Sequence, residues 1–311
     1  MKLLFILDPL THLKAYKDTS LAIMREAQAR GHQLFVCEQH DLRLKQGVVY
    51  VDAQSFCFST EEAWYSVQPK QQHLPQDFEA IFMRKDPPFD NEYLYSTYLL
   101  ELAQTQGGRI INNPVAIRNW NEKLSVAKFP QLAPDFIVTA NNALIREFLA
   151  EQEDIIVKPL DGMGGSGVFR LTQHDPNIGA ILETITKLEQ QTVMAQRYLP
   201  AIAHGDKRII IINGKPLPYA LARIPKAGET RGNLAAGGKG LAQVLTERDL
   251  EIADTVGTAL KAEGLFLVGL DVIGDYLTEV NVTSPTGMVE IAAQTSCNPA
   301  QVLMDALEAT H

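Results

Sequence analysis

Residues 155–172, IIVKPLDGMGGSGVFRLT, decide the fold of this chain. Their glycines fit the pattern G-x-G-x-x-G, which in a dinucleotide-binding fold opens a helix. Here Val168–Thr172 predicts a strand instead, and no Gly-Lys-Ser/Thr follows as it would in a Walker P-loop. We therefore expect a glycine-rich hairpin that can fold over phosphate groups and offer them backbone N–H groups. An ordinary surface turn is the alternative, and the density of glycines directly after a strand that carries Lys158 disfavours it.

The chain before this stretch predicts alternating strands and helices. The expected strands are Leu3–Leu7, Gln33–Cys37, Ala80–Arg84 and Arg109–Asn112, the expected helices are Thr19–Arg30 and Glu92–Gln106, and Val48–Phe58 is expected to form a hairpin. A βα-repeating start implies a parallel sheet with helices on its faces. We therefore expect an N-terminal α/β domain over residues 1–121.

The chain after residue 121 changes in character. We expect a small central α/β domain over 122–200, with a strand at Phe136–Thr139, a helix at Ala143–Glu151 and the glycine-rich hairpin, followed by a β-rich α+β domain over 201–311. Asn213-Gly214 between two apolar runs is a strong hairpin signal. The remaining expected elements are a helix at Glu247–Glu263, a hairpin over Leu265–Val282 and a last helix at Pro299–Glu308.

Composition and charge narrow the class of protein. A chain of 311 residues with net charge -9 lacks the basic footprint of a nucleic-acid-binding protein, although a few arginines can still make a positive cleft. A membrane-spanning helix needs about 18 consecutive apolar residues, and no stretch of this sequence approaches that length. The three cysteines Cys37, Cys57 and Cys297 show no paired or metal-like spacing. We therefore expect a cytoplasmic protein that binds neither nucleic acid nor membrane.

An acidic hairpin near the end of the chain predicts a metal site. Glu279 and Asn281 are two residues apart on an expected strand, so their side chains share one face, and Asp271 lies on the preceding strand. A two-residue turn at Gly274-Asp275 would place Glu279 on the face opposite Asp271, whereas a three-residue turn would set the two carboxylates side by side. All-oxygen ligands of this kind suit Mg²⁺, with Mn²⁺ as an alternative. A solvated strand face is the weaker interpretation, since the neighbouring residues are apolar.

Cations occur where a phosphate-binding site would need them. Lys158 lies in an apolar strand, where an unpaired ammonium would be costly to bury, and a phosphate partner would remove that cost. Residues 223–240, RIPKAGETRGNLAAGGKG, have no helical or strand period and predict a functional lid. Lys123, Arg84 and Arg208 add positive charge, although each alone is more often a surface residue.

Together these stretches resemble the prokaryotic glutathione synthetases of the ATP-grasp ligase family. The most discriminating matches are KPLDGMGG (158–165) and GETRGNLAAGG (228–238), and MRKDPPFD (83–90), NEKL (121–124), VGLDVIGD (268–275) and TEVNVTSPTG (278–287) also match. The resemblance implies a parallel α/β domain followed by a two-lobed ATP-grasp fold. It also implies that ATP phosphorylates γ-glutamylcysteine and that glycine attacks the acyl phosphate. Residues 40–75 and 288–298 receive no role.

The resemblance also implies roles for particular residues. Arg208 and Arg223 would be catalytic, Asp271, Glu279 and Asn281 would bind Mg²⁺, and Arg84, Ser284, Pro285 and Thr286 would hold the peptide substrate. ATP would be bound by Lys123, Lys158, Gly162, Gly164, Gly165, Gln196, Arg197, Tyr198, Leu199 and Asp206. Within this set, the segment Gln196–Leu199 would form the adenine-binding hinge, largely through its backbone groups. The lid would include Arg231, Gly232, Asn233, Gly237 and Gly238, and the family precedent favours a homotetramer.

Three other functions compete with this interpretation. The nearest is another ATP-grasp ligase that joins a different acid and amine. A nucleotide-binding regulatory module on the same fold is disfavoured, because the acidic cluster and both arginines are present. A dehydrogenase is disfavoured by the strand that follows the glycine-rich loop.

Overall fold

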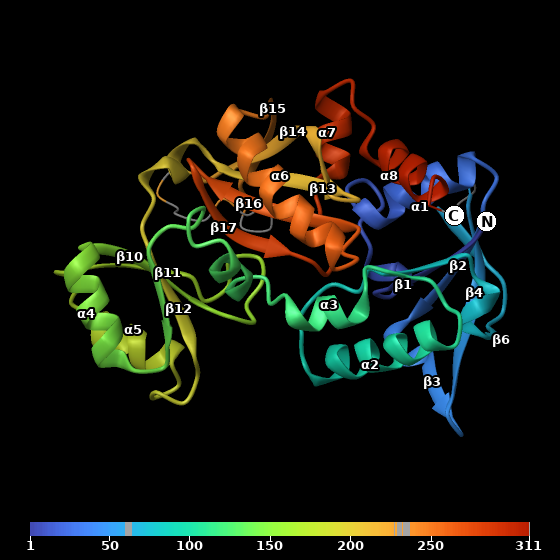
Figure 1. Ribbon diagram of the computed structural model, residues 1–311, viewed down its shortest axis with the longest axis horizontal. Helices are drawn as coiled ribbons and strands as arrows, with labels where there is room; N and C mark the ends of the chain where they lie inside the picture. Colours follow the sequence, from blue (N-terminus) through green and yellow to red (C-terminus); the bar gives the residue numbers. More distant parts are fainter. Residues whose placement is uncertain (60–63, 227, 229–231, 233–236, 311) are drawn as a thin grey trace.

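The computed structural model describes residues 1–59, 64–226, 228, 232 and 237–310. Three β-sheets follow one another along this part of the chain. Figure 1 shows the second sheet with its two helices at one end of the molecule and the first sheet at the other, while the third sheet lies between and above them. This arrangement agrees with the expected α/β start followed by a two-lobed α+β region.

The first sheet is parallel at its centre. Its strand order is β3-β4-β2-β1-β7-β8, with β5 and β6 paired to β4. Leu4 and Ile6 of β1 enter one hydrophobic cluster, whereas Leu3, Phe5 and Leu7 enter another, as expected of a parallel strand covered on both faces. The elements are β1 (Lys2–Leu7), α1 (Thr19–Ala29), β2 (Gln33–Glu38), β3 (Leu42–Lys45), β4 (Val48–Phe58), β5 (Tyr65–Val67), β6 (Gln71–His73), β7 (Ala80–Met83), α2 (Asn91–Thr105), β8 (Ile110–Ile111) and α3 (Pro114–Asn119).

The predicted hairpin within Val48–Phe58 is wrong. These residues form the single strand β4, and the hairpin joins β4 to β3, with Lys45 paired to Val48. The turn is Gln46-Gly47, in which both residues have positive φ, 50° and 83°. Glycine adopts this conformation without strain. The turn of the hairpin therefore lies at Gln46-Gly47 rather than inside the alternating run that follows.

The second sheet is antiparallel, in the order β11-β10-β12-β9. Its elements are β9 (Phe136–Thr139), α4 (Asn142–Gln152), β10 (Asp154–Pro159), β11 (Phe169–Thr172), α5 (Ile178–Ile185) and β12 (Val193–Arg197). Ile145, Leu149, Ile155 and Leu182 belong to one hydrophobic cluster that joins the helices to the sheet. Since β10 and β11 are paired antiparallel neighbours, the glycine-rich stretch connects two strands, as predicted.

The third sheet has the order β15-β14-β13-β16-β17. Its strands and helices are β13 (Asp206–Ile212), β14 (Lys215–Ile224), β15 (Lys239–Val244), α6 (Glu247–Ala262), β16 (Leu267–Ile273), β17 (Tyr276–Asn281), α7 (Met288–Gln294) and α8 (Pro299–Glu308). Ile209 and Ile211 share a cluster with α6, whereas Ile210 and Ile212 share another with α7 and α8. Helices therefore cover both faces. The Asn213-Gly214 hairpin is confirmed, because Ile212 pairs with Lys215.

The register between β16 and β17 differs from both alternatives raised by the sequence. The turn is the two-residue Gly274-Asp275, since Ile273 pairs with Tyr276. The ladder then shifts by one residue at Thr278, so Asp271 stands opposite Glu279. This irregularity restores the facing carboxylates that a regular two-residue hairpin would have separated.

Two limits of the expected lid segment also need correction. Arg223 and Ile224 belong to β14, and Lys239 and Gly240 belong to β15, where the four residues pair. The strands therefore reach further into this segment than its irregular composition indicated. Separately, no helix among the described residues is both long and apolar enough to cross a membrane.

Asn112, directly after β8, joins the first sheet to the third. Its Nδ2 donates to the carbonyl oxygens of Leu267 (2.8 Å) and Val282 (2.9 Å). Its Oδ1 accepts from the backbone N–H groups of Phe266 (2.7 Å) and Leu267 (2.8 Å). The Asn112 side chain is buried, and so are its partners Leu267 and Val282. Asn112 therefore satisfies backbone groups of two hairpin arms at once.

We expect Asn112→Ala to lower the free energy of unfolding by about 3 kcal/mol, because buried peptide groups lose their partners. The midpoint of urea unfolding measures the change. Asn91→Ala, at the exposed first position of α2, is the control and should leave the midpoint unchanged. Equal midpoints for Asn112→Ala and the wild type would contradict the role of this side chain.

Candidate active site

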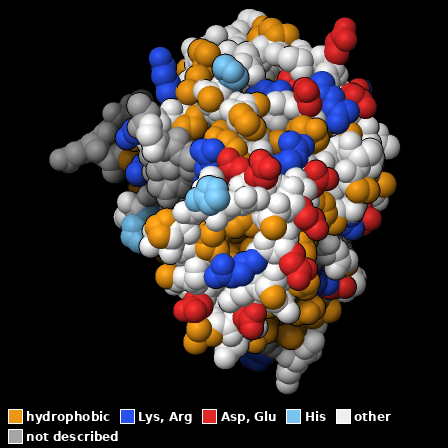
Figure 2. Space-filling view, turned by 90° about the vertical axis from the view of Figure 1, so that its left-hand side faces the viewer, with side chains coloured by type: hydrophobic (Ala, Val, Ile, Leu, Met, Phe, Trp, Pro, Cys, Tyr) orange, Lys and Arg blue, Asp and Glu red, His pale blue; other side chains and the backbone are white. Residues whose placement is uncertain are grey.

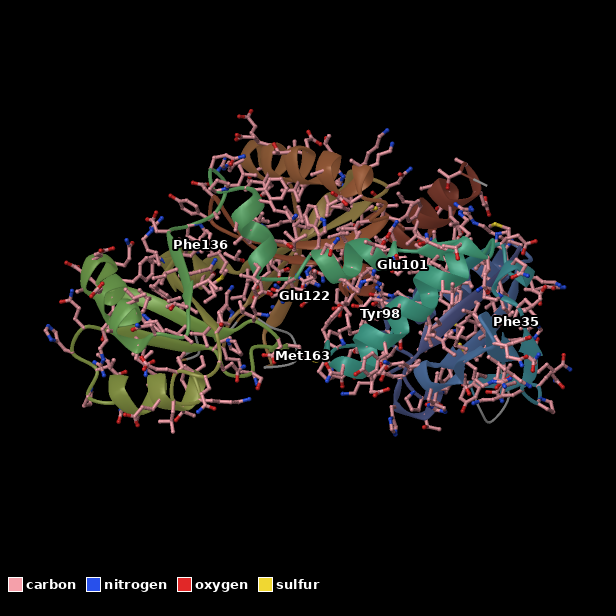
Figure 3. The ribbon with its side chains drawn as sticks, turned by 60° about the horizontal axis from the view of Figure 1, so that its bottom comes forward. Phe35, Tyr98, Glu101, Glu122, Phe136 and Met163 are labelled. Atoms are coloured by element: carbon pink, nitrogen blue, oxygen red, sulfur yellow. The ribbon has the colours of Figure 1, made fainter. Side chains whose placement is uncertain are left out.

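A cavity of about 490 Å³ lies where loops that follow strands of the first sheet meet the second and third sheets. Figure 3 places Met163 of the glycine-rich loop and Glu122 toward this centre, between the two ends of the molecule. Figure 2 shows that acidic and basic side chains are interspersed on the face at the second-sheet end, without a broad patch of one sign. Charged side chains also meet inside the cavity, whose lining includes Lys123, Lys158, Asp206, Arg208, Arg223, Asp271 and Glu279.

One wall of the cavity carries the acidic hairpin. Asp271 of β16 stands opposite Glu279 of β17, and Asn281 follows two residues later on the face of Glu279. The Asn281 Nδ2 donates to the carbonyl oxygen of Gly269 at 3.2 Å. All three predicted metal ligands line the cavity. The structure therefore brings together the oxygen donors that the sequence suggested.

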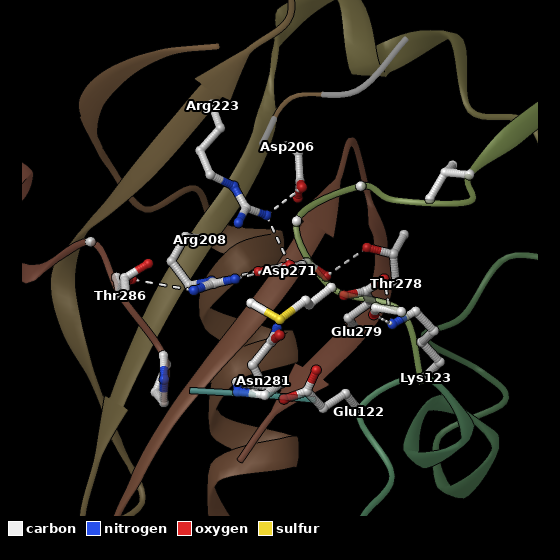
Figure 4. A pocket seen from close by; sticks show the side chains of 18 of the residues that line it. Glu122, Lys123, Asp206, Arg208, Arg223, Asp271, Thr278, Glu279, Asn281 and Thr286 are labelled. Carbon is white, nitrogen blue, oxygen red and sulfur yellow. Dashed lines mark hydrogen bonds and ion pairs between the residues drawn. The ribbon is translucent and has the colours of Figure 1, made fainter. Parts of the chain in front are cut away.

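Two arginines, one on β13 and one on β14, hold Asp271 (Figure 4). The Arg208 Nε donates to Asp271 Oδ1 at 2.6 Å, and Arg223 Nη2 lies 2.8 Å from Oδ2. Arg223 also pairs with Asp206. Although burial opposes ionisation, the two guanidinium groups hold the pKa of Asp271 well below its usual range. Arg208 also donates to the carbonyl oxygen of Thr286 at 3.2 Å.

Asp206 behaves in the opposite way. Burial, with a further contribution from the nearby Asp271, raises the pKa of Asp206 to about 6, although Arg223 works against the shift. One of its oxygens, Oδ1, is buried without a hydrogen-bond partner among the described residues. Asp206 is therefore poised to accept a hydrogen bond or a proton.

Two lysines approach the hairpin from the other side. The Lys158 Nζ lies 3.2 Å from Glu279 Oε1, and the Lys123 Nζ lies 3.9 Å from the same atom. Burial lowers the pKa of Lys158. Burial also opposes ionisation of Glu279, yet Lys123 and Lys158 hold the pKa of Glu279 below its usual value. Glu279 thus occupies the place that the sequence analysis gave to a phosphate partner of Lys158.

The glycine-rich loop needs its glycines. Gly164 and Gly165 have φ of 62° and 81°, which most side chains avoid, and a Cβ on Gly162 would lie 2.7 Å from Pro159 Cγ. The three glycines line the cavity. The Lys123 Nζ donates to the carbonyl oxygen of Gly162 at 2.7 Å. This bond ties the loop to the site.

The predicted adenine hinge, Gln196–Leu199, lines the cavity as well. Its backbone is partly committed, because the N–H of Arg197 donates to the carbonyl oxygen of Asp135 and that of Tyr198 donates to that of Asp154. In addition, the Gln196 Nε2 is buried without a hydrogen-bond partner among the described residues. The Gln196 side-chain amide, on a residue already expected to bind ATP, is thus an available hydrogen-bond donor.

The predicted peptide-binding residues separate into two layers. Ser284, Pro285 and Thr286 line the cavity, whereas Arg84 is buried and does not. Arg84 donates to the Ser20 Oγ and to the carbonyl oxygen of Pro285, both at 2.9 Å. Burial lowers the pKa of Arg84. Its observed contacts hold the turn in place from behind.

The structure describes only three of the five predicted lid residues, Gly232, Gly237 and Gly238. Arg231 and Asn233 lie outside the described residues. Of the described glycines, Gly232 packs so closely on Arg223 that a Cβ would lie 2.3 Å from its carbonyl oxygen, and a Cβ on Gly238 would lie 2.3 Å from that of Gly232. Gly237 lies beside Lys226. None of these three glycines lines the cavity.

Several lining residues were missed by the sequence analysis. They come from the segment between β1 and α1, from the loop after β7, from the neighbourhood of the acidic hairpin and from α7: His12, Leu13, Lys14, Lys17, Asp18, Asp86, Pro87, Glu122, Thr283 and Glu290. Glu122 accepts a hydrogen bond from the Thr283 Oγ1 at 2.8 Å, and burial raises the pKa of Glu122. Its position beside Lys123 was a signal that could have identified it.

The walls of the cavity are chemically suited to phosphoryl transfer. Buried polar atoms without a partner among the described residues occur on Gln196, Asp206, Arg223 and Glu290, which indicates that a polar ligand completes them. Phosphoryl transfer depends on positioned positive charge more than on a protein nucleophile. Lys123, Lys158, Arg208 and Arg223 supply that charge, and the acidic hairpin supplies oxygen ligands.

Comparisons with known families agree with this chemistry. The model of the prokaryotic glutathione synthetase N-terminal domain matches residues 1–118, and that of the prokaryotic glutathione synthetase ATP-grasp domain matches residues 122–296.

Full-length relatives match as well. The chain is 55% identical to a glutathione synthetase of Nitrosomonas europaea over 99% of this chain and 98% of that protein. Corresponding proteins of Neisseria meningitidis and Salmonella typhimurium are 53% and 49% identical, each over 99% of this chain and 98% of the relative.

Solved structures with lower identity share the fold. D-cycloserine synthetase DcsG has a TM-score of 0.71 at 16% identity and covers 99% of both chains. The ATP-grasp ligase PsnB, in a complex with a minimal precursor, Mg and ADP, has a TM-score of 0.64 at 17% identity and covers 99% of this chain and 97% of its own. The family models and the full-length relatives show that this chain belongs to the prokaryotic glutathione synthetases, which are ATP-dependent ligases of the ATP-grasp family.

Proposed function

We propose that this protein joins γ-glutamylcysteine to glycine, with ATP converted to ADP and phosphate through an acyl phosphate. The observation that carries the proposal is the buried group in which Arg208 and Arg223 share Asp271 opposite Glu279, next to Lys123 and Lys158. Such a site can hold the phosphates of a nucleotide and a carboxylate beside each other. Family membership supports the choice of substrates.

Each group of residues has a part in this proposal. ATP is bound by Lys123, Lys158, the glycine-rich loop, the segment 196–199 and Asp206. Arg208 and Arg223 stabilise the negative charge that develops on the acyl phosphate and on the tetrahedral intermediate. Ser284–Thr286 contact the peptide substrate, and Arg84 supports them from behind. Residues 226–239 act as a lid that excludes water from the acyl phosphate. Arg231 and Asn233, which the resemblance assigns to this lid, lie outside the described residues.

The acidic hairpin fits a magnesium ion. Two carboxylates and an amide oxygen are hard donors, and Mg²⁺ usually combines one or two protein carboxylates with water and substrate phosphates. Asp271, Glu279 and Asn281 would hold the ion, which neutralises phosphate charge when bound. Asp271 and Glu279 are paired with Arg208 and Lys158, and these cations balance the charge of the two carboxylates. Mn²⁺ suits the same donors.

The proposal extends to the organisation of the molecule. It includes three domains, over 1–121, 122–200 and 201–311, a division that the succession of three sheets along the chain supports. A homotetramer follows the family precedent. A cytoplasmic location is consistent with three free cysteines, of which Cys37 is buried.

ADP release tests the proposed reaction. Turnover should require γ-glutamylcysteine together with glycine, and should fall when D-alanine or another amine replaces glycine. Turnover with a different acid and amine, but not with this pair, would show that the protein catalyses another ATP-grasp ligation.

Glu279→Gln should lower Mg²⁺-dependent turnover on the order of a thousandfold, because the variant loses one carboxylate of the metal site. Initial rates over a range of Mg²⁺ concentrations measure the effect. Glu263→Gln, an exposed position at the end of α6, removes the same charge outside the cavity and should be neutral. Full activity of Glu279→Gln would remove Glu279 from the metal site.

Arg223→Ala should lower the rate by roughly a hundredfold while ATP still binds, because the variant loses a cation directed at developing charge. Steady-state rates and ATP binding are measured side by side. Arg248→Ala breaks a surface ion pair with Glu251 and is the control. A change confined to the apparent affinity for ATP would assign Arg223 to nucleotide binding instead.

A further inference from the structure

Glu290 lies on α7, in a segment to which the sequence analysis gave no role, and it forms part of the cavity wall. Its Oε2 is buried, and no described residue donates a hydrogen bond to it. A buried carboxylate oxygen without a donor is unfavourable, because nothing replaces the water that it has lost. The missing donor therefore points to a ligand.

The position of Glu290 relates it to the reacting centre. Helix α7 starts after Gly287, and Glu290 is in its first turn. Because helical side chains lean toward the N-terminus of their helix, Glu290 leans toward the turn at Thr286-Gly287. Arg208 donates to the Thr286 carbonyl oxygen at 3.2 Å, and a Cβ on Gly287 would lie 3.5 Å from the Arg208 Cγ. Figure 4 shows Thr286 beside Arg208.

The helix that presents Glu290 is held at both ends. Met288 and Ile291 are buried in the cluster that α7 shares with α1 and α8. At the other end, the Gln294 Oε1 accepts from the backbone N–H of Ala242 at 3.0 Å, and its Nε2 donates to the carbonyl oxygen of Gly240 at 3.3 Å. A carboxylate on a fixed element can define where a ligand group sits.

The charge of Glu290 limits which chemical groups can donate a hydrogen bond to its Oε2. A phosphate or carboxylate would be repelled by Glu290. A metal ion shared with the acidic hairpin is disfavoured, because the described residues contain no group of three or more His, Cys, Asp and Glu side chains arranged to hold one. The cationic groups of the proposed substrates are α-ammonium groups, which supply N–H donors and the complementary charge.

We propose that Glu290 binds the α-ammonium group of an amino-acid substrate, an inference that rests on the proposed function. Glycine carries such a group, and so does the glutamyl end of γ-glutamylcysteine. Proximity to Arg208 favours glycine, because the glycine nitrogen must reach the carbonyl carbon whose charge Arg208 stabilises. Glu290 is then a residue that selects and positions a substrate.

The test is Glu290→Gln, which keeps the shape of the side chain and removes its charge. KM is measured separately for glycine, γ-glutamylcysteine and ATP. The KM for one amino-acid substrate should rise about tenfold or more, as expected for the loss of a charge-assisted hydrogen bond, while the KM for ATP stays constant. A rise for glycine identifies the incoming amine, and a rise for γ-glutamylcysteine identifies the glutamyl end. Unchanged values for both, or an equal rise for ATP, would overturn the proposal.

Controls separate this inference from the function on which it rests. Glu251→Gln, on the exposed side of α6, should leave all three KM values unchanged, and Glu290→Asp should restore part of the loss. If the wild type itself releases no ADP with γ-glutamylcysteine and glycine, the proposed function fails. Calorimetric binding of each substrate to the wild type and to Glu290→Gln then decides the inference independently, since equal affinities would refute it.

Discussion

One buried carboxylate shared by two guanidinium groups organises this molecule. Asp271 is paired across the sheet with Arg208, and Arg223 is paired across the sheet with Asp206, so three adjacent strands place charge at two successive positions on one face of the sheet. Removing one partner of a buried ion pair costs several kcal/mol, because the other charge is left uncompensated. The register of β13, β14 and β16 is therefore inseparable from the chemistry of the cavity.

The second sheet is joined to this centre by charge. Lys158 reaches Glu279 from β10, and Lys123 ties the glycine-rich loop to the same place. A nucleotide phosphate would compete with Glu279 for both ammonium groups, so ligand binding and the contact between the sheets involve the same cations. A chain with net charge -9 can bind anions here because its cations converge on one cavity.

Local patterns predicted the elements well and the pairing of strands less well. The glycine-rich connection between β10 and β11, the Asn213-Gly214 turn and the last helix depend on neighbours in the chain, and each was recognised. The run Val48–Phe58 and the shift that sets Asp271 opposite Glu279 were not. Alternation alone does not say which strand a run will join or where a ladder gains a residue.

The sequence by itself determined the fold class, the family and most of the residue types of the cavity, because those are carried by short motifs with distinct local chemistry. Only the tertiary structure decided which groups meet. Lys158 and Glu279 are 121 residues apart, Arg84 supports a turn 201 residues away, and Glu290 belongs to a segment without a motif. Such contacts depend on how sheets and helices pack against each other, and packing brings together residues whose separation along the chain carries no signal.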